Sequence, residues 1–244
     1  MAIKGDYAYV ADGQEGLRII DISNFSNPGE ISFLNTGGFA KDITVSEDYA
    51  YIVDDINGLH IIDISLPSNP VEVASLNTGK GGQRIAVSGN YAFVADVDDG
   101  LRIIDVSNYS YPFEAAIDSG FPSGVAISHN FAYVTNGHGL KIIDISYPPN
   151  WAEVGFLNTG NAMDVTVKGR YAFVADGWNG LRVIDNLNPS KPTQTSVFNF
   201  GDFAENIAVS GNYVYVSNKF SGLWIIDISD LSVPVEAGFF NTGD

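Results

Sequence analysis

The sequence predicts an all-β protein, a six-bladed β-propeller whose blades are four-stranded antiparallel sheets. The string YAYVADGQEGLRIIDIS, at residues 7–23, recurs in related form six times, and its first aromatic residues lie 40 or 42 residues apart. Those six residues are Tyr7, Tyr49, Tyr91, Phe131, Tyr171 and Tyr213. Each copy holds four short segments rich in β-branched and aromatic residues and shows no helical periodicity. Four strands in a period of about 40 residues are typical of a propeller blade.

The second copy illustrates the elements expected in every blade. Its four expected strands are Asp42–Ser46, Tyr49–Asp54, Leu59–Ser65 and Val71–Asn77, bounded by Gly, Asn, Asp or Pro. A turn ending in glycine closes each copy, and we expect a positive φ there. These turns are Asn35–Gly37, Asn77–Gly79, Asp118–Gly120, Asn158–Gly160, Asn199–Gly201 and Asn241–Gly243. We expect residues 1–244 to form a single domain, with repeats starting near residues 1, 43, 85, 125, 165 and 207.

The second strand of each copy predicts how blades stack. Tyr49 and Tyr51 flank Ala50, and the same alternation of large and small residues recurs in the other copies. Because side chains alternate across a strand, the large residues share one face and the small residue lies on the other. We therefore expect blades to pack bulky face against shallow face, and this packing to supply most of the stability.

Alignment of the copies also locates the chain ends. Met1 aligns with Ile43, and Asp244 aligns with Gly38. We therefore expect both ends to be adjacent, in a connection between two blades, and each terminal blade to be built from one end of the chain alone.

The segment between the second and fourth expected strands resembles the LVIVD repeat family. It reads GLRIIDIS at residues 16–23, GLHIIDIS at 58–65, GLRIIDVS at 100–107, GLKIIDIS at 139–146, GLRVIDNL at 180–187 and GLWIIDIS at 222–229. The resemblance implies a β-propeller, often one domain of a larger secreted or cell-surface protein of bacteria or archaea, and brings no catalytic motif. We accordingly expect an extracellular or cell-surface location. Residues 1–10 do not read as a secretion signal, so we expect any such signal outside this chain.

Composition narrows the classes of partner. The net charge is −17, from 29 acidic and 12 basic residues, which disfavours nucleic acids and anionic membranes. The chain has no cysteine, which excludes thiol chemistry and disulfides. We expect a monomer whose partner is a protein or a small polar or cationic ligand.

Candidate binding residues lie where the copies differ from one another. In a propeller, the loops between second and third strands share a face with the connections that enter each first strand. Because the central mouth of such a ring is concave, its divergent polar residues form the default site hypothesis. The candidate ligand-binding residues are Asp42, Arg84, Asp164, Glu205, Asn206 and, on a blade-five loop, Trp178. Phe220 diverges similarly, and Phe39, Phe121 and Phe203 are expected to fill the centre of the ring.

The favoured function is a non-catalytic interaction or structural module, without a required cofactor. The alternative is a Ca²⁺-dependent hydrolase resembling lactonases, or a lectin-like binder, with Asp42, Asp164, Glu205 and Asn206 around one ion. The carboxylates in Asp96–Gly100 are interpreted as a solvated turn. No catalytic residue is predicted, because the three histidines form no recognisable nucleophile motif and His60 occupies an outward, surface position.

One aspartate recurs in every copy and is predicted to be scaffold. We expect each to accept a backbone N–H in the following turn, as aspartate does in Asx-turns. The six are Asp21, Asp63, Asp105, Asp144, Asp185 and Asp227. Asp12, at the end of the second strand, is interpreted as a turn residue on the candidate face.

Overall fold

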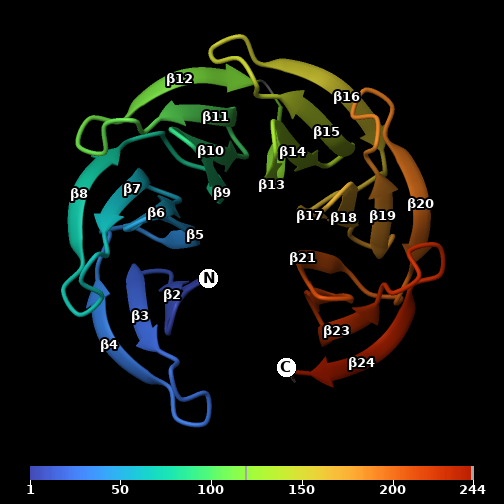
Figure 1. The fold of residues 1–244 in the computed structure, drawn as a ribbon, viewed down its shortest axis with the longest axis horizontal. Helices are drawn as coiled ribbons and strands as arrows, with labels where there is room; N and C mark the ends of the chain where they lie inside the picture. The colour runs from blue at the N-terminus through green and yellow to red at the C-terminus, as the bar shows by residue number, and fades with distance from the viewer. Residues whose placement is uncertain (119, 243–244) are drawn as a thin grey trace. The chain divides into compact units, whose positions relative to one another are not determined.

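A computed structural model describes residues 1–118 and 120–242, which form twenty-four β-strands in six four-stranded sheets. The strands group into two compact units, Met1–Phe121 and Pro122–Asp244, with three sheets in each (Figure 1). The fold is a six-bladed β-propeller, as the repeat predicts. The expectation of one domain across residues 1–244 stays a prediction.

The first unit contains blades one to three. Their strands are β1 (Ala2–Lys4), β2 (Tyr7–Ala11), β3 (Leu17–Asp21), β4 (Gly29–Leu34), β5 (Ala40–Ser46), β6 (Tyr49–Asp54), β7 (Gly58–Asp63), β8 (Val71–Leu76), β9 (Gly82–Ser88), β10 (Tyr91–Asp96), β11 (Gly100–Asp105) and β12 (Phe113–Asp118).

The second unit contains blades four to six. Their strands are β13 (Pro122–Ser128), β14 (Phe131–Asn136), β15 (Gly139–Asp144), β16 (Ala152–Asn158), β17 (Asp164–Lys168), β18 (Tyr171–Ala175), β19 (Leu181–Asp185), β20 (Thr193–Phe198), β21 (Ala204–Ser210), β22 (Tyr213–Asn218), β23 (Gly222–Asp227) and β24 (Val235–Asn241).

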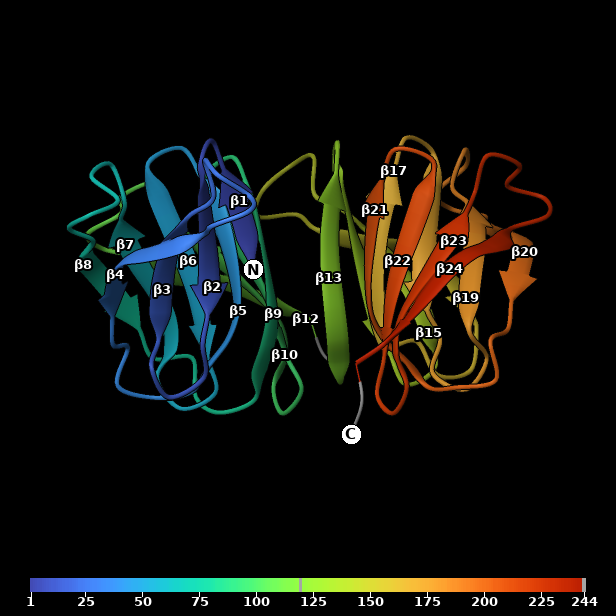
Figure 2. The same ribbon diagram turned by 90° about the horizontal axis from the view of Figure 1, so that it is seen from below.

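Every blade is a meander of four consecutive antiparallel strands. β1 pairs only within blade one and β24 only within blade six, which confirms that each terminal blade is built from one end of the chain. The adjacency of the two ends stays a prediction. The loops lie at both ends of the strands, so each unit has two loop-bearing faces (Figure 2).

A β-bulge recurs between the third and fourth strands of all six blades. In blade two the register shifts between Ile61 and Ile62, and the equivalent step shifts in the others. A bulge increases local twist and bends the strand. The fourth strand of every blade therefore carries the same local irregularity.

The core lies between neighbouring blades inside each unit. Tyr51 and Ile61 of blade two pack against Ala92 and Val94 of blade three, and all four side chains are buried. In the second unit, Phe173 of blade five packs on Val214 of blade six. Bulky aromatic residues thus meet small or β-branched ones, which confirms the predicted stacking within each unit.

The Asn-Thr-Gly turns have the predicted backbone. Gly37 and Gly79 adopt φ values of 79° and 86°, and each donates its N–H to the Oδ1 of the asparagine two residues before it. Glycine is favoured there because this φ strains other residues. The expected turns at residues 118–120 and 241–243 include Ser119 and Gly243, which lie outside the described residues. The described residues contain no helix long and apolar enough to span a membrane.

Candidate functional site

Two sets of loops meet at one face of each unit, as the sequence predicts. Gly13, in the loop after β2, forms an isolated antiparallel bridge with Ala40 at the start of β5. Gly177 forms the equivalent bridge with Ala204 at the start of β21. We call this side of each unit its loop face.

Bulges shape the edge of the loop face. The register of the first two strands shifts at the same place in four blades, which leaves one residue of the first strand outside the ladder. These residues are Lys41, Gln83, Ser123 and Glu205. A bulge at such a rim re-aims side chains that would otherwise follow the pleat. Glu205, one of the predicted binding residues, is therefore placed differently from its neighbour Asn206.

Asp42 and Asp164 hold neighbouring blades together inside their own units. An Asp42 carboxylate oxygen accepts the N–H of Ile85 in the next blade at 3.1 Å. Asp164 accepts the N–H of Ile207 at 3.0 Å, and the same carboxylate accepts its neighbour Val165 at 2.9 Å. Both units therefore contain this bond, and in each the donor lies 43 residues after the acceptor in sequence. This geometry gives both predicted ligand-binding residues a structural role.

Burial raises the pKa of Asp42, although N–H bonds from Ile85 and Ile43 and the charge of Arg84 oppose that rise. A raised pKa in the folded state means that ionisation at neutral pH opposes folding. Asp42 therefore contributes most to the free energy of unfolding below its ordinary pKa. That contribution is lost as the pH rises through the raised pKa.

We therefore expect Asp42→Asn to leave the melting temperature at pH 7 unchanged or higher, because the amide oxygen still accepts the Ile85 N–H. The stability of the wild type relative to the variant should rise as pH falls from neutral through the raised pKa of Asp42, and should level off below its ordinary pKa of about 4. Asp42→Ala, which removes the acceptor, should cost about 1–3 kcal/mol. Thermal melting across pH checks both, and a large loss for Asp42→Asn at pH 7 would contradict the assignment.

Two other candidate binding residues, Arg84 and Asn206, also make hydrogen bonds within their own units. Arg84 donates from Nη1 to the carbonyl of Gln83 at 3.0 Å, and its charge is near Asp42. Asn206 donates its amide to the hydroxyl of Ser217 at 3.1 Å. The structure thus brings Asp42 and Arg84 together in the first unit, and Asp164 and Asn206 near each other in the second.

Trp178 belongs to an exposed aromatic cluster on the loop face of the second unit, which consists of Trp178, Phe203 and Phe220. The Trp178 side chain is 59% exposed and that of Phe220 is 58% exposed. The Trp178 and Phe220 rings are stacked with centroids 6.1 Å apart, and Phe203 meets Trp178 edge-on at 5.6 Å. Three aromatic residues from two blades therefore form one continuous surface.

The loop that carries Trp178 is tightly constrained. Within its turn, Asp176 donates its N–H to Gly180, and Asn199 donates its side-chain amide to the Trp178 carbonyl at 3.4 Å. Gly177 has a φ of 53°, and a Cβ there would lie 2.3 Å from the Asn161 amide nitrogen. A side chain here would have to displace the Asn161 amide at a φ that L residues rarely adopt, so glycine is favoured in the loop that presents Trp178.

The aspartate that ends the second strand is buried in three blades, contrary to the expectation of a solvated turn. Asp54, Asp96 and Asp176 are fully buried. Asp96 accepts Nε of Arg102 at 3.2 Å, and Asp176 accepts the same atom of Arg182. The Asp98 and Asp99 side chains are exposed, so the expectation of a solvated turn holds for these two only. Asp12 forms the equivalent pair with Arg18 on a more exposed loop.

The histidines differ from their predicted placement in one case. His60 is only 3% exposed, and its Nδ1 lies 3.0 Å from a carboxylate oxygen of Glu72. The surface prediction for His60 was wrong, because this strand position is largely buried, as it also is for the equivalent Arg102 and Arg182. His138 is exposed on the loop face, and His129 contacts Ser128 in a hairpin. Within residues 1–118 and 120–242, no three acidic or histidine side chains gather as a metal site.

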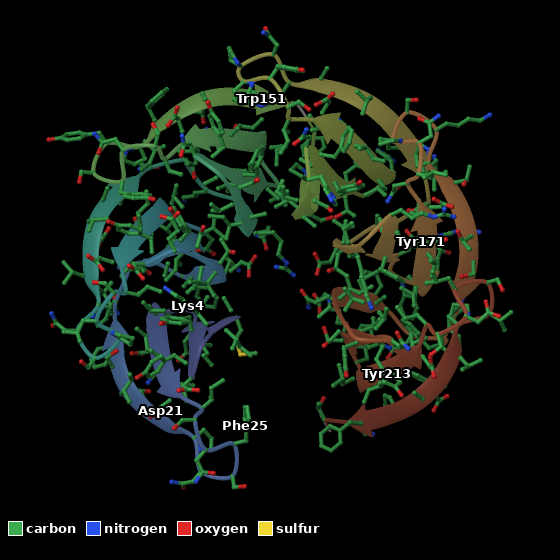
Figure 3. The ribbon with its side chains drawn as sticks, in the orientation of Figure 1. Lys4, Asp21, Phe25, Trp151, Tyr171 and Tyr213 are labelled. Carbon is green, nitrogen blue, oxygen red and sulfur yellow. The ribbon has the colours of Figure 1, made fainter. Side chains whose placement is uncertain are left out.

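The recurring aspartates of the third strand have the predicted role. Asp21, at the end of β3 (Figure 3), accepts the N–H of Ser23 at 2.8 Å, and its five equivalents likewise accept the N–H two residues later. Bonds from the serine two residues later hold the pKa of Asp21 and Asp227 below the ordinary value. Six identical turns confirm a scaffold role.

A family model described as the LVIVD repeat matches the chain six times, at residues 1–36, 37–78, 81–117, 119–159, 159–199 and 201–242. The chain belongs to the LVIVD repeat family. No protein with a curated description matches this LVIVD-repeat chain.

Solved structures show the same fold at low identity. A putative 6-phosphogluconolactonase from Bacteroides uniformis has a TM-score of 0.80 and 14% identity, with 98% of this chain and 84% of that chain covered. The Cps50 (Swd1) β-propeller domain of Myceliophteria thermophila has a TM-score of 0.80 and 12% identity, covering 98% and 83%. A chain of a nidogen/laminin complex has a TM-score of 0.68 and 12% identity, covering 97% and 94%. At these identities the similarity shows the propeller fold alone.

Sequence reasoning missed two features of the LVIVD-repeat chain. The first is the edge-on contact with Trp178 made by Phe203, a residue expected only to fill the centre of the ring. The second is the threonine of the Asn-Thr-Gly turn: Thr36 and Thr159 are buried and donate their hydroxyls to Asp54 and Asp176 of the next blade. The recurrence of threonine at this position was the available signal.

Proposed function

We propose that this LVIVD-repeat chain is a non-catalytic binding module and that it binds its partner through the loop face of the second unit. The observation that carries the proposal is the aromatic cluster of Trp178, Phe203 and Phe220. Large aromatic side chains that are exposed on a constrained backbone are enriched at interfaces, where they supply contact area at low entropic cost.

Comparison among blades supports this position. The loop position of Trp178 holds Gln14 in blade one, Ile56 in blade two and Asp98 in blade three. A requirement of packing would select similar residues in every blade, as it does for the buried aspartates and the stacked aromatics. Divergence combined with exposure favours recognition of something outside the chain.

The absence of an enzymatic role is part of the proposal. Asp42 and Asp164, the carboxylates expected to serve a metal ion, already accept backbone N–H bonds from neighbouring blades. A Ca²⁺-dependent lactonase-like hydrolase or a lectin-like binder is the alternative that an experiment must separate from this proposal.

We also propose that the module is one domain of a larger protein. The family resemblance and the net charge of −17 support a monomeric domain of a secreted or cell-surface protein. A protein or a small cationic ligand suits that charge, and nucleic acids and anionic membranes do not.

The test uses Trp178 as its own reporter. Trp151 and Trp224 are half-buried, so a ligand on the loop face should chiefly change the emission of Trp178. The chain is titrated with an oligosaccharide and with acidic, neutral and basic peptides, and 6-phosphogluconolactone hydrolysis is followed with and without Ca²⁺. We expect at least one probe to change the emission and no lactone turnover above background. Turnover that Asp42→Asn or Asp164→Asn abolishes would contradict the proposal.

A further inference from the structure

We propose that the aromatic cluster binds a lysine- or arginine-rich segment of a protein partner, with Trp178 as the anchoring residue. This inference rests on the proposed function and adds the chemistry of the occupant. Three observations support it: the geometry of the rings, the cations already held by similar rings, and the charge around them.

The rings offer accessible π-faces. Trp178 and Phe220 are stacked with an interplanar angle of 21°, and both side chains are more than half exposed. Phe203 supports the Trp178 ring from its edge at 81°. A cation within about 6 Å of a ring centroid is attracted by the ring quadrupole, and tryptophan is the strongest such partner.

In each unit an aromatic residue of the loop face already contacts a lysine ammonium. The Lys219 ammonium lies 5.9 Å from the Phe220 centroid, and the Lys41 ammonium lies 4.6 Å from that of Phe39. The cation–π contacts among the described residues involve Phe39, Tyr171 and Phe220, and none of them uses Trp178. The best ring for a cation is therefore available to one from a partner.

The surrounding charge favours a basic partner. Asp202 immediately precedes Phe203, and Glu205 follows two residues later. Burial tends to raise the pKa of Asp202, but hydrogen bonds from Ser221, Asn218 and the Phe203 N–H hold it below the ordinary value. The Asp202 carboxylate is thus anionic at neutral pH and opposes the charge of Lys219, and the net charge of −17 attracts a basic segment and repels an acidic one.

The experiment compares four twelve-residue probes by titration calorimetry. One peptide alternates Arg and Gly, one alternates Lys and Gly, one alternates Glu and Gly, and one alternates Ser and Gly. Maltohexaose serves as a carbohydrate probe. We expect the two basic peptides to bind, the arginine peptide more tightly, with affinity that falls as salt is raised. The other three probes should not bind at the same concentrations.

Variants separate the cluster from general acidity. Trp178→Gln imports the residue that blade one has at this position, and Phe220→Gln does the same for blade six. Ile56→Gln is the matched control, because Ile56 is 52% exposed at the same loop position in blade two. We expect Trp178→Gln to lower the affinity for the arginine peptide at least about tenfold. Ile56→Gln should leave that affinity within about twofold of the wild-type value. Trp178→Phe should restore part of the affinity, and melting curves confirm folding of each variant.

Several results would overturn the inference. If Trp178→Gln binds the basic peptides as tightly as the wild type, their attraction comes from net charge alone. Failure of both basic peptides to bind would overturn it too. If maltohexaose or the acidic peptide binds in a way that depends on Trp178, the occupant is not a basic segment. The proposed binding function would then still stand. Lactone turnover, by contrast, would overturn the proposed function.

Discussion

Replacing Asp176 with alanine is expected to destabilise the protein by about 3–5 kcal/mol, the cost typical of breaking a buried ion pair from one side. The Asp176 carboxylate is fully buried and accepts Nε of Arg182, the Thr159 hydroxyl at 2.8 Å and the N–H of Asn161 at 2.9 Å. Truncation leaves the arginine, which is itself largely buried, without its counter-charge. Chemical denaturation at pH 7 measures the loss.

Asp12→Ala is the matched control for this prediction. Asp12 pairs with Arg18 in the same turn of blade one, but the two side chains are 47% and 32% exposed. Because water screens that pair, Asp12→Ala should lower the free energy of unfolding much less than Asp176→Ala does. Equal losses for the two variants would show that burial does not determine the strength of this pair.

Replacing Phe173 with alanine is expected to cost about 3–5 kcal/mol, because it removes a buried aromatic ring and leaves a cavity between blades five and six. Phe173 is 1% exposed and packs in one cluster with Val214 and Ile226 of the next blade. The effect should appear as a lower denaturation midpoint.

Tyr213→Ala provides the comparison for Phe173. Tyr213 lies on the same kind of strand, β22, but its side chain is 41% exposed. Tyr213→Ala should lower the free energy of unfolding by less than half as much as Phe173→Ala, because Tyr213 buries less apolar area on folding. Similar losses would contradict face-to-face packing of blades as the main source of stability.

The sequence predicted the parts of the fold that follow from the repeat and from the alternation of side chains along a strand. A repeat of about 40 residues predicted blades, and alternation around Ala50 predicted which face of a blade receives its neighbour. Recurrence of Asp21 in all six copies predicted the same turn six times. These features are local, or repeat so often that one copy explains the others.

Features that depend on contacts between blades were harder to predict. The burial of Asp54 depends on Thr36 of the preceding blade, which alignment of single copies cannot place beside it. His60 replaces an arginine and was expected at the surface, but its ring is buried and lies 3.0 Å from Glu72. The pairing of Trp178 with Phe203 likewise joins two blades.

We infer that binding occurs where the repeat diverges, at the aromatic cluster. This inference is tested by the affinity of the alternating Arg-Gly peptide for the double variant Trp178→Gln, Phe220→Gln, measured beside the wild type and Ile56→Gln by calorimetry. We predict a loss of more than about tenfold for the double variant and none for Ile56→Gln. Equal affinity for all three proteins would contradict the claim.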